Sequence, residues 1–88
     1  MQTNIKEKMA SALSLPKEIV LDLPTVTIIG FQDIRVENYK NILEFTDDTI
    51  RLSTKKGNLT ITGQNLTLKE VTTELIIITG RIIACTMD

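Results

Sequence analysis

The sequence contains no histidine and only one cysteine in 88 residues. Without histidine, catalysis would need a carboxylate pair, a serine–lysine pair or the lone thiol, and a zinc site would lack its usual ligands. A single cysteine excludes an internal disulfide, and the lack of a disulfide framework fits a reducing compartment. We therefore expect no enzymatic activity, no metal site and no cofactor.

Aromatic side chains and charge of one sign are also scarce. Only Phe31, Tyr39 and Phe45 are aromatic, and ten Lys and Arg against eleven Asp and Glu give a net charge of −1. Nucleic-acid-binding domains of this size usually carry a strong basic excess, and readers of single strands add stacking aromatics. We expect no nucleic acid among the partners.

Long apolar runs are missing too. The longest, Leu75 to Ile78, is far shorter than the roughly 20 residues of a membrane span, and polar residues interrupt the N-terminal region before any signal-peptide core forms. The sequence predicts a cytoplasmic protein with at most peripheral membrane contact.

The N-terminal region, residues 1–24, is predicted to be a short helix followed by a connector. Ile5, Met9 and Leu13 recur every four residues and would share one helix face, available to the sheet, to a partner or to an anionic membrane beside Lys6 and Lys8. Pro16 should end this helix. Residues 15–24 are interpreted as extended, with a short helical turn after Pro16 as the alternative.

Residues 25–88 form the predicted domain. Thirteen threonines and thirteen isoleucines in the chain favour strands, and glycine and asparagine clusters punctuate the pattern. We predict an all-β fold: a small antiparallel two-layer sandwich or partly open barrel of about eight short strands, or alternatively a curved single-layer sheet. The expected strands are 25–29, 33–37, 42–46, 49–53, 59–62, 66–71, 74–79 and 81–87, joined by hairpins.

The last two predicted strands are apolar on both faces. Either this hairpin is central and covered on both sides, or its outer face meets another protein or another copy of the chain. Ile76, Ile78 and Ile83 are therefore candidate partner-surface residues. Cys85 is predicted to be a buried apolar residue, with a reactive or intermolecular thiol as the alternative.

The charged and glycine-containing joins are interpreted as turns. Asp47 and Asp48 are adjacent and would face different ways at a hairpin turn. Lys55 and Lys56 would form a hairpin tip, or else a contact to an anionic surface. Gly57 and Gly63 lack the strand-to-helix context of a phosphate-binding loop and are predicted to be turn glycines.

Nearly the whole chain resembles the YabP/YqfC family of bacterial sporulation proteins, and its YqfC branch in particular. The resemblance depends on the order and spacing of many short pieces. They are Leu15-Pro16, Leu21-Asp22-Leu23-Pro24, Ile28-Ile29-Gly30, Val36-Glu37-Asn38-Tyr39-Lys40, Ile42-Leu43-Glu44-Phe45, Ile50-Arg51-Leu52, Gly57, Leu59-Thr60-Ile61-Thr62-Gly63 and Leu66-Thr67-Leu68.

The resemblance implies a protein without known catalysis, made in the mother cell of endospore formers, with a YqfD-like membrane-associated sporulation protein as its expected partner. The family supplies no catalytic residues. Its recurrent turn, Glu37, Asn38, Tyr39 and Lys40, is a candidate partner surface, with a purely structural role as the alternative. Our main hypothesis is thus a binding and assembly protein, with a homo-oligomer as one form it could take. The alternative is a module that binds a small ligand or an anionic membrane surface.

Overall fold

The computed structural model describes residues 23–88, which form six antiparallel strands in one sheet. Along the sheet the order is β1-β2-β6-β5-β4-β3. The prediction of an all-β antiparallel domain is confirmed, whereas the predicted helix with Ile5, Met9 and Leu13 lies outside the described residues. The strands are β1 (Thr25–Ile29), β2 (Asp33–Glu37), β3 (Tyr39–Phe45), β4 (Thr49–Thr54), β5 (Gly57–Val71) and β6 (Leu75–Met87).

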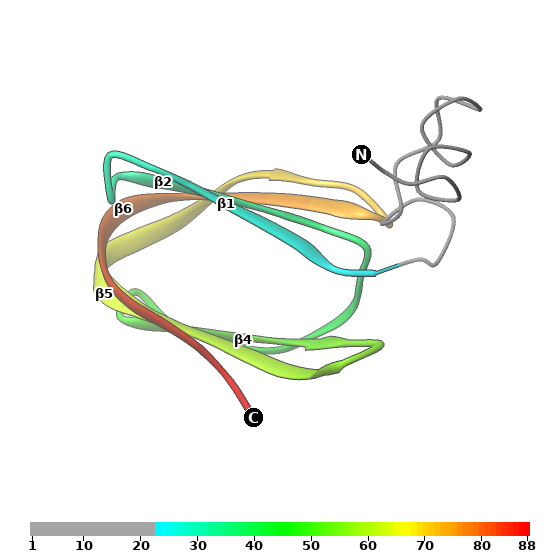
Figure 1. Ribbon diagram of the computed structural model, residues 1–88. Coiled ribbons are helices and arrows are strands. Elements are labelled where there is room, and N and C mark those ends of the chain that lie inside the picture. The colour runs from blue at the N-terminus through cyan, green and yellow to red at the C-terminus, as the bar shows by residue number, and fades with distance from the viewer. Residues whose placement is uncertain (1–22) are drawn as a thin grey trace, which may run out of the picture.

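The sheet folds over on itself because its two longest strands bend (Figure 1). β2 pairs with the first half of β6, while β4 pairs with the first half of β5. The first half of β6 therefore lies in one layer with β1 and β2, and its second half lies in the other layer near β4 and β3. One sheet thus makes both layers of a partly open barrel, the shape expected from the sequence.

Six strands form instead of eight because two predicted turns are bends inside long strands. Residues 59–62 and 66–71 belong to β5, and residues 74–79 and 81–87 belong to β6. At the bend the register of β5 and β6 shifts between Gln64 and Thr67. The predicted hairpins at 63–65 and at Gly80 are therefore wrong, and so is the prediction of a C-terminal hairpin.

Glycine is needed at this bend because the two backbones approach closely. A side chain on Gly63 would overlap the carbonyl oxygen of Arg81. On Gly80 it would lie 2.6 Å from the carbonyl oxygen of Asn65, and Gly80 also has a φ of +143°. Glycine at these two positions suggested turns, but here it allows two backbone segments to approach closely, which is another common reason for glycine in a strand.

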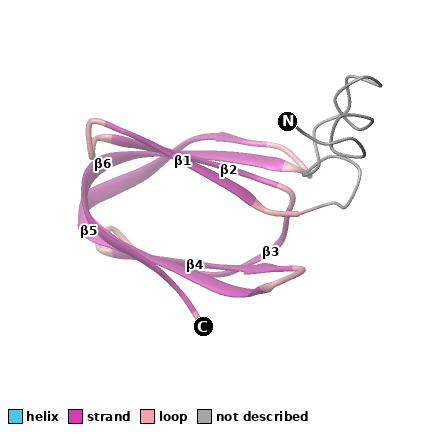
Figure 2. Cartoon of the chain, viewed as in Figure 1, coloured by secondary structure: helices cyan, strands magenta, loops and turns pink. Residues whose placement is uncertain are grey.

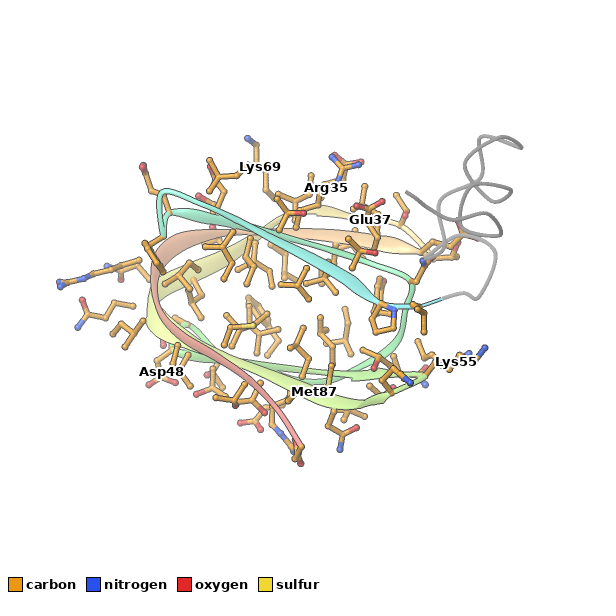
Figure 3. The ribbon with its side chains drawn as sticks, in the orientation of Figure 1. Arg35, Glu37, Asp48, Lys55, Lys69 and Met87 are labelled. Carbon is orange, nitrogen blue, oxygen red and sulfur yellow. The ribbon has the colours of Figure 1, made fainter. Side chains whose placement is uncertain are left out.

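Inward-facing aliphatic residues of both layers form the core (Figure 3). Ile76 and Ile78 have no exposed surface, so their assignment to a partner surface is wrong: as residues of a central strand they pack into the core. Outward-facing side chains such as Arg35 and Lys69 point away from it. The buried apolar residues are Ile34, Val36, Tyr39, Ile50, Leu52, Leu59, Ile61, Leu66, Ile76, Ile78 and Ile82.

The chain crosses from one layer to the other at Asn38, between β2 and β3 (Figure 2). β2 pairs with β1 and β6, whereas β3 forms the far edge of the sheet beside β4. The hairpin predicted at 38–41 is thus wrong. β3 begins at Tyr39, directly after a corner that links the two layers.

Candidate functional site

The corner residues Asn38 and Tyr39 are held by hydrogen bonds to distant segments. Asn38 has a φ of 66°, the left-handed conformation that asparagine tolerates well. Its backbone N–H donates to the Glu74 carbonyl at 2.7 Å, and its side-chain amide donates to the Leu23 carbonyl at 2.8 Å. Tyr39 is 9% exposed, and its hydroxyl donates to the Thr72 carbonyl at 2.5 Å. Both side chains are engaged in closing one end of the barrel.

The other two residues of the candidate turn face solvent. Glu37 and Arg35 form an ion pair, with 3.4 Å between Oε2 of Glu37 and Nε of Arg35, and both side chains are more than 40% exposed. An exposed pair of this kind contributes little to stability. Lys40 is exposed at the beginning of β3. Of the predicted turn surface, only Glu37 and Lys40 are available to a partner.

Replacing Tyr39 with phenylalanine is expected to lower the free energy of unfolding by about 1 kcal/mol, because the Thr72 carbonyl loses its donor while the ring stays in place. Phe31→Tyr, the reverse exchange at a side chain that is 66% exposed, is the matched control and should leave stability unchanged. Urea denaturation followed by circular dichroism measures both. Equal stability of Tyr39→Phe and wild type would contradict the role assigned to the hydroxyl.

β3, which begins at this corner, carries exposed apolar side chains. We define the β3 patch as Ile42, Leu43, Phe45 and, from β5, Val71, whose exposed fractions are 39%, 47%, 47% and 48%. Ile42 and Phe45 lie opposite the fully buried Leu52 and Ile50, and Val71 lies opposite the fully buried Ile76. These three residues therefore face the barrel interior and are still accessible.

These residues are accessible because β3 and the second half of β5 lie on either side of a line without strand pairing, which we call the seam. The seam is fastened at both ends, by the bond from Tyr39 to Thr72 and by the Leu66 N–H donating to the Asp47 carbonyl at 2.8 Å. Within residues 23–88 no ladder of backbone hydrogen bonds joins the two strands between these points. Sequence reasoning missed the β3 patch; the only signal was that Ile42-Leu43-Glu44-Phe45 has apolar residues on both faces.

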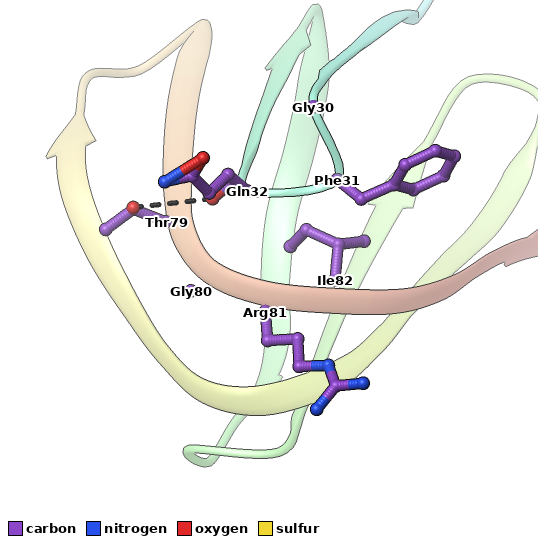
Figure 4. Close-up of a pocket in the computed structure, with 7 residues that line it drawn as sticks. All are labelled: Gly30, Phe31, Gln32, Thr79, Gly80, Arg81 and Ile82. Carbon is purple, nitrogen blue, oxygen red and sulfur yellow. Dashed lines mark hydrogen bonds between the residues drawn. The ribbon is translucent and has the colours of Figure 1, made fainter.

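A shallow depression of about 630 Å³ lies at the bend (Figure 4). The β1–β2 turn, Gly30 to Gln32, forms one wall, and Thr79 to Ile82 of β6 forms the other. The Thr79 hydroxyl donates to the Gln32 carbonyl at 3.4 Å. Arg81 is the only charged residue that lines it, so the depression contains neither a general base nor an activated nucleophile.

The remaining reactive candidates have structural roles. The carboxylate of Asp48 accepts hydrogen bonds from the hydroxyls of Thr46 and Thr49, which confirms the predicted turn role. Cys85 is half-buried, rather than fully buried, against the core edge opposite Ile61, and this burial raises the pKa of its thiol. A raised pKa leaves less thiolate at neutral pH and makes the thiol less reactive.

Residues 23–88 contain no cluster of three or more Cys, Asp or Glu side chains placed to hold a metal ion. In the same range no helix is long and apolar enough to cross a bilayer.

Comparison with known proteins gives matches over most of the chain. The model of the YabP family matches residues 22–88. The uncharacterized protein YqfC of Bacillus subtilis (strain 168) is 32% identical over 81 residues, which cover 92% of this chain and 87% of that protein. No solved structure matches significantly.

Proposed function

The chain belongs to the YabP family, a sporulation-associated family that is not a known enzyme family, and on that premise we propose that it is a non-catalytic binding and assembly protein of endospore formation. We propose further that it acts in the mother-cell cytoplasm, at the inner face of a membrane. Its proposed partner is a membrane-associated sporulation protein of the YqfD type.

The β3 patch is the observation that supports this proposal. Four large apolar side chains, three on the edge strand β3 and one at the end of β5, remain between 39% and 48% exposed, although the core residues opposite them on β4 and β6 are fully buried. Clustered apolar exposure of this kind is typical of protein-binding surfaces. Lys40 and Glu44 on the same strand supply a polar rim of both signs.

An apolar patch with a mixed-charge rim favours a protein over an anionic membrane. Peripheral membrane binding combines an apolar face with an excess of Lys and Arg, which attract anionic headgroups. The β3 strand carries one charge of each sign, so it offers no net attraction to such a surface. A protein surface that presents an apolar groove between polar groups fits better.

The test is affinity capture of the tagged full-length chain from sporulating cells in mild detergent, comparing wild type with Leu43→Lys. Leu43 is 47% exposed, so the Leu43→Lys variant should fold normally yet place a charge within the β3 patch. We expect a YqfD-like membrane protein to co-purify with wild type and to be reduced at least tenfold with Leu43→Lys. Ile83→Lys, at a side chain that is 58% exposed outside the β3 patch, is the control and should retain the partner.

If wild type captures only proteins without membrane segments, the proposed partner is wrong. If Leu43→Lys and wild type capture the membrane protein equally, the β3 patch is not the contact surface. Flotation of the purified chain with anionic vesicles separates the remaining alternative, because only a membrane-surface module would float without any partner protein.

A further inference from the structure

The C-terminal part of β6 has one edge without a partner strand in the region that the structure describes. β2 covers this edge from Leu75 to Thr79. The β1–β2 turn then covers it at two points, where the N–H groups of Gly80 and Ile82 donate to the carbonyls of Gln32 and Phe31 at 3.0 and 2.9 Å. Beyond that point β6 diverges from β1 toward the C-terminus (Figure 1). We call Ile83–Met87 the β6 edge.

The register shows which backbone groups of the β6 edge point outward. The N–H of Asp88 donates to the Asn58 carbonyl, so residues 58 and 88 are a hydrogen-bonded pair. Hydrogen-bonded pairs alternate along an antiparallel ladder, so Thr86 and Ala84 bond to Thr60 and Thr62 of β5. The N–H and C=O groups of Cys85 and Met87 therefore point to the free edge. They form a regular, unused row of donors and acceptors.

The chemistry of the β6 edge differs from that of the other side of the barrel. β3 carries Lys40, Glu44 and two register shifts, and the end of β5 carries Lys69 and Glu70. Charges and bulges are common devices against edge-to-edge pairing. The β6 edge has neither charge nor proline, and its one irregularity, at Ile83, leaves Ala84 to Met87 regular.

We infer that the β6 edge pairs antiparallel with the β6 edge of a second copy of this chain. In each copy the layer that contains β3, β4 and the second half of β6 would thereby become part of one continuous sheet. The inference is independent of the proposed partner, which is assigned to the β3 patch on the other side of the barrel. In the pair, Cys85 and Met87 of each copy exchange backbone hydrogen bonds with the outward-pointing residues of the other.

A second copy fits because the β6 edge complements itself. Its outward groups recur at every second residue, so a two-fold axis perpendicular to the strand brings donors opposite acceptors in antiparallel pairing. An uncharged edge needs an uncharged partner, since an unpaired buried charge is costly, and the second copy supplies one. The contact also covers the side chains of Ile83 and Met87, which are 58% and 45% exposed. A two-fold contact closes after two copies and leaves no β6 edge free.

Sedimentation velocity of the full-length chain tests the inference. We expect wild type to sediment as a dimer that dissociates on dilution, and Ile83→Lys to sediment as a monomer with an unchanged circular dichroism spectrum, because lysine disfavours edge pairing. Met87→Pro is a second variant: its lost N–H points to the free edge, so no internal hydrogen bond is broken. Leu43→Lys, in the β3 patch, is the control and should remain dimeric. A wild type that is monomeric at every concentration would overturn the inference.

Amide hydrogen exchange gives a residue-level readout. In wild type at high concentration, the amides of Ala84 and Thr86 and those of Cys85 and Met87 should all exchange slowly. In Ile83→Lys, the amides of Cys85 and Met87 should exchange at least tenfold faster, while Ala84 and Thr86 keep their bonds to β5. Slow exchange of Cys85 and Met87 in a monomeric variant would mean that the chain covers its own β6 edge, and would overturn the inference.

Discussion

Replacing Ile76 with aspartate is expected to unfold the protein, whereas the same change at the next residue, Ile77, should leave it folded. Ile76 has no exposed surface and lies opposite Val36 and Val71 on the inner face of β6. Ile77 is only partly buried, and it lies opposite Arg35 and Glu70 on the outer face. The two substitutions test the two faces of one strand.

The expected effect at Ile76 is as large as the stability of the whole domain. A buried carboxylate without a partner costs several kcal/mol, and a chain of this length has a total stability of about 4 to 13 kcal/mol. At Ile77 the carboxylate stays in water near one positive and one negative side chain, so we expect a loss of about 1 kcal/mol or less. Circular dichroism with urea denaturation measures both variants.

A folded Ile76→Asp variant with near wild-type stability would contradict the burial of the inner face of β6 in the core. Unfolding of both variants would instead mean that the outer face of β6 is covered as well. The same pair of variants therefore decides between the two readings of the C-terminal apolar segment that the sequence left open.

Alanine is expected to destabilise the protein by about 1 to 3 kcal/mol at Gly63, the cost of overpacking, and by about 2 to 5 kcal/mol at Gly80, where the positive φ adds about 1 to 2 kcal/mol. The added carbon would meet backbone atoms: the Arg81 carbonyl at Gly63, and the Asn65 carbonyl, 2.6 Å away, at Gly80. Backbone held in two ladders cannot shift as a flexible side chain can. The bend that folds the sheet into two layers would have to open.

Gly30→Ala is the control, because Gly30, like Gly80, has a positive φ, here 59°, but open space around it. Its nearest neighbour would be the Gln32 side chain at 4.0 Å, so only the backbone term of about 1 kcal/mol remains. Thermal and urea denaturation rank the three variants. If Gly63→Ala is no less stable than Gly30→Ala, close approach of the strands is not the reason for glycine at the bend.

The sequence alone was sufficient for the class of the fold and for the turns between several of its strands. Apolar and polar residues alternate in Ile50-Arg51-Leu52 and Leu59-Thr60-Ile61, which is typical of strands with one inner and one outer face, and the structure buries the isoleucines and leucines of both segments. The turns at Gly30, Asp47-Asp48 and Lys55-Lys56 were predicted correctly because their residues favour turn backbones locally. Period and turn chemistry are local properties, which a sequence displays directly.

Strand length and layer assignment depended on contacts between distant segments. Gly63 and Gly80 look like turn residues, yet each lies within a long strand, because the strands bend past each other there. Asn38 was predicted to lie in a turn and has the left-handed backbone that asparagine tolerates, but only the tertiary structure makes that turn a crossover between layers.

The candidate surfaces were decided almost wholly by tertiary structure. In the sequence Ile76, Ile78 and Ile83 are equally apolar, but the fold buries the first two and exposes the third, because the register of β6 slips by one residue at Ile83. Ile42 and Phe45 face inward like core residues and remain accessible, because no strand of the described chain pairs across their seam. Composition and local pattern determined that this protein forms an antiparallel β domain rich in isoleucine and threonine; the folding of one sheet over itself decided which of its apolar residues a partner can reach.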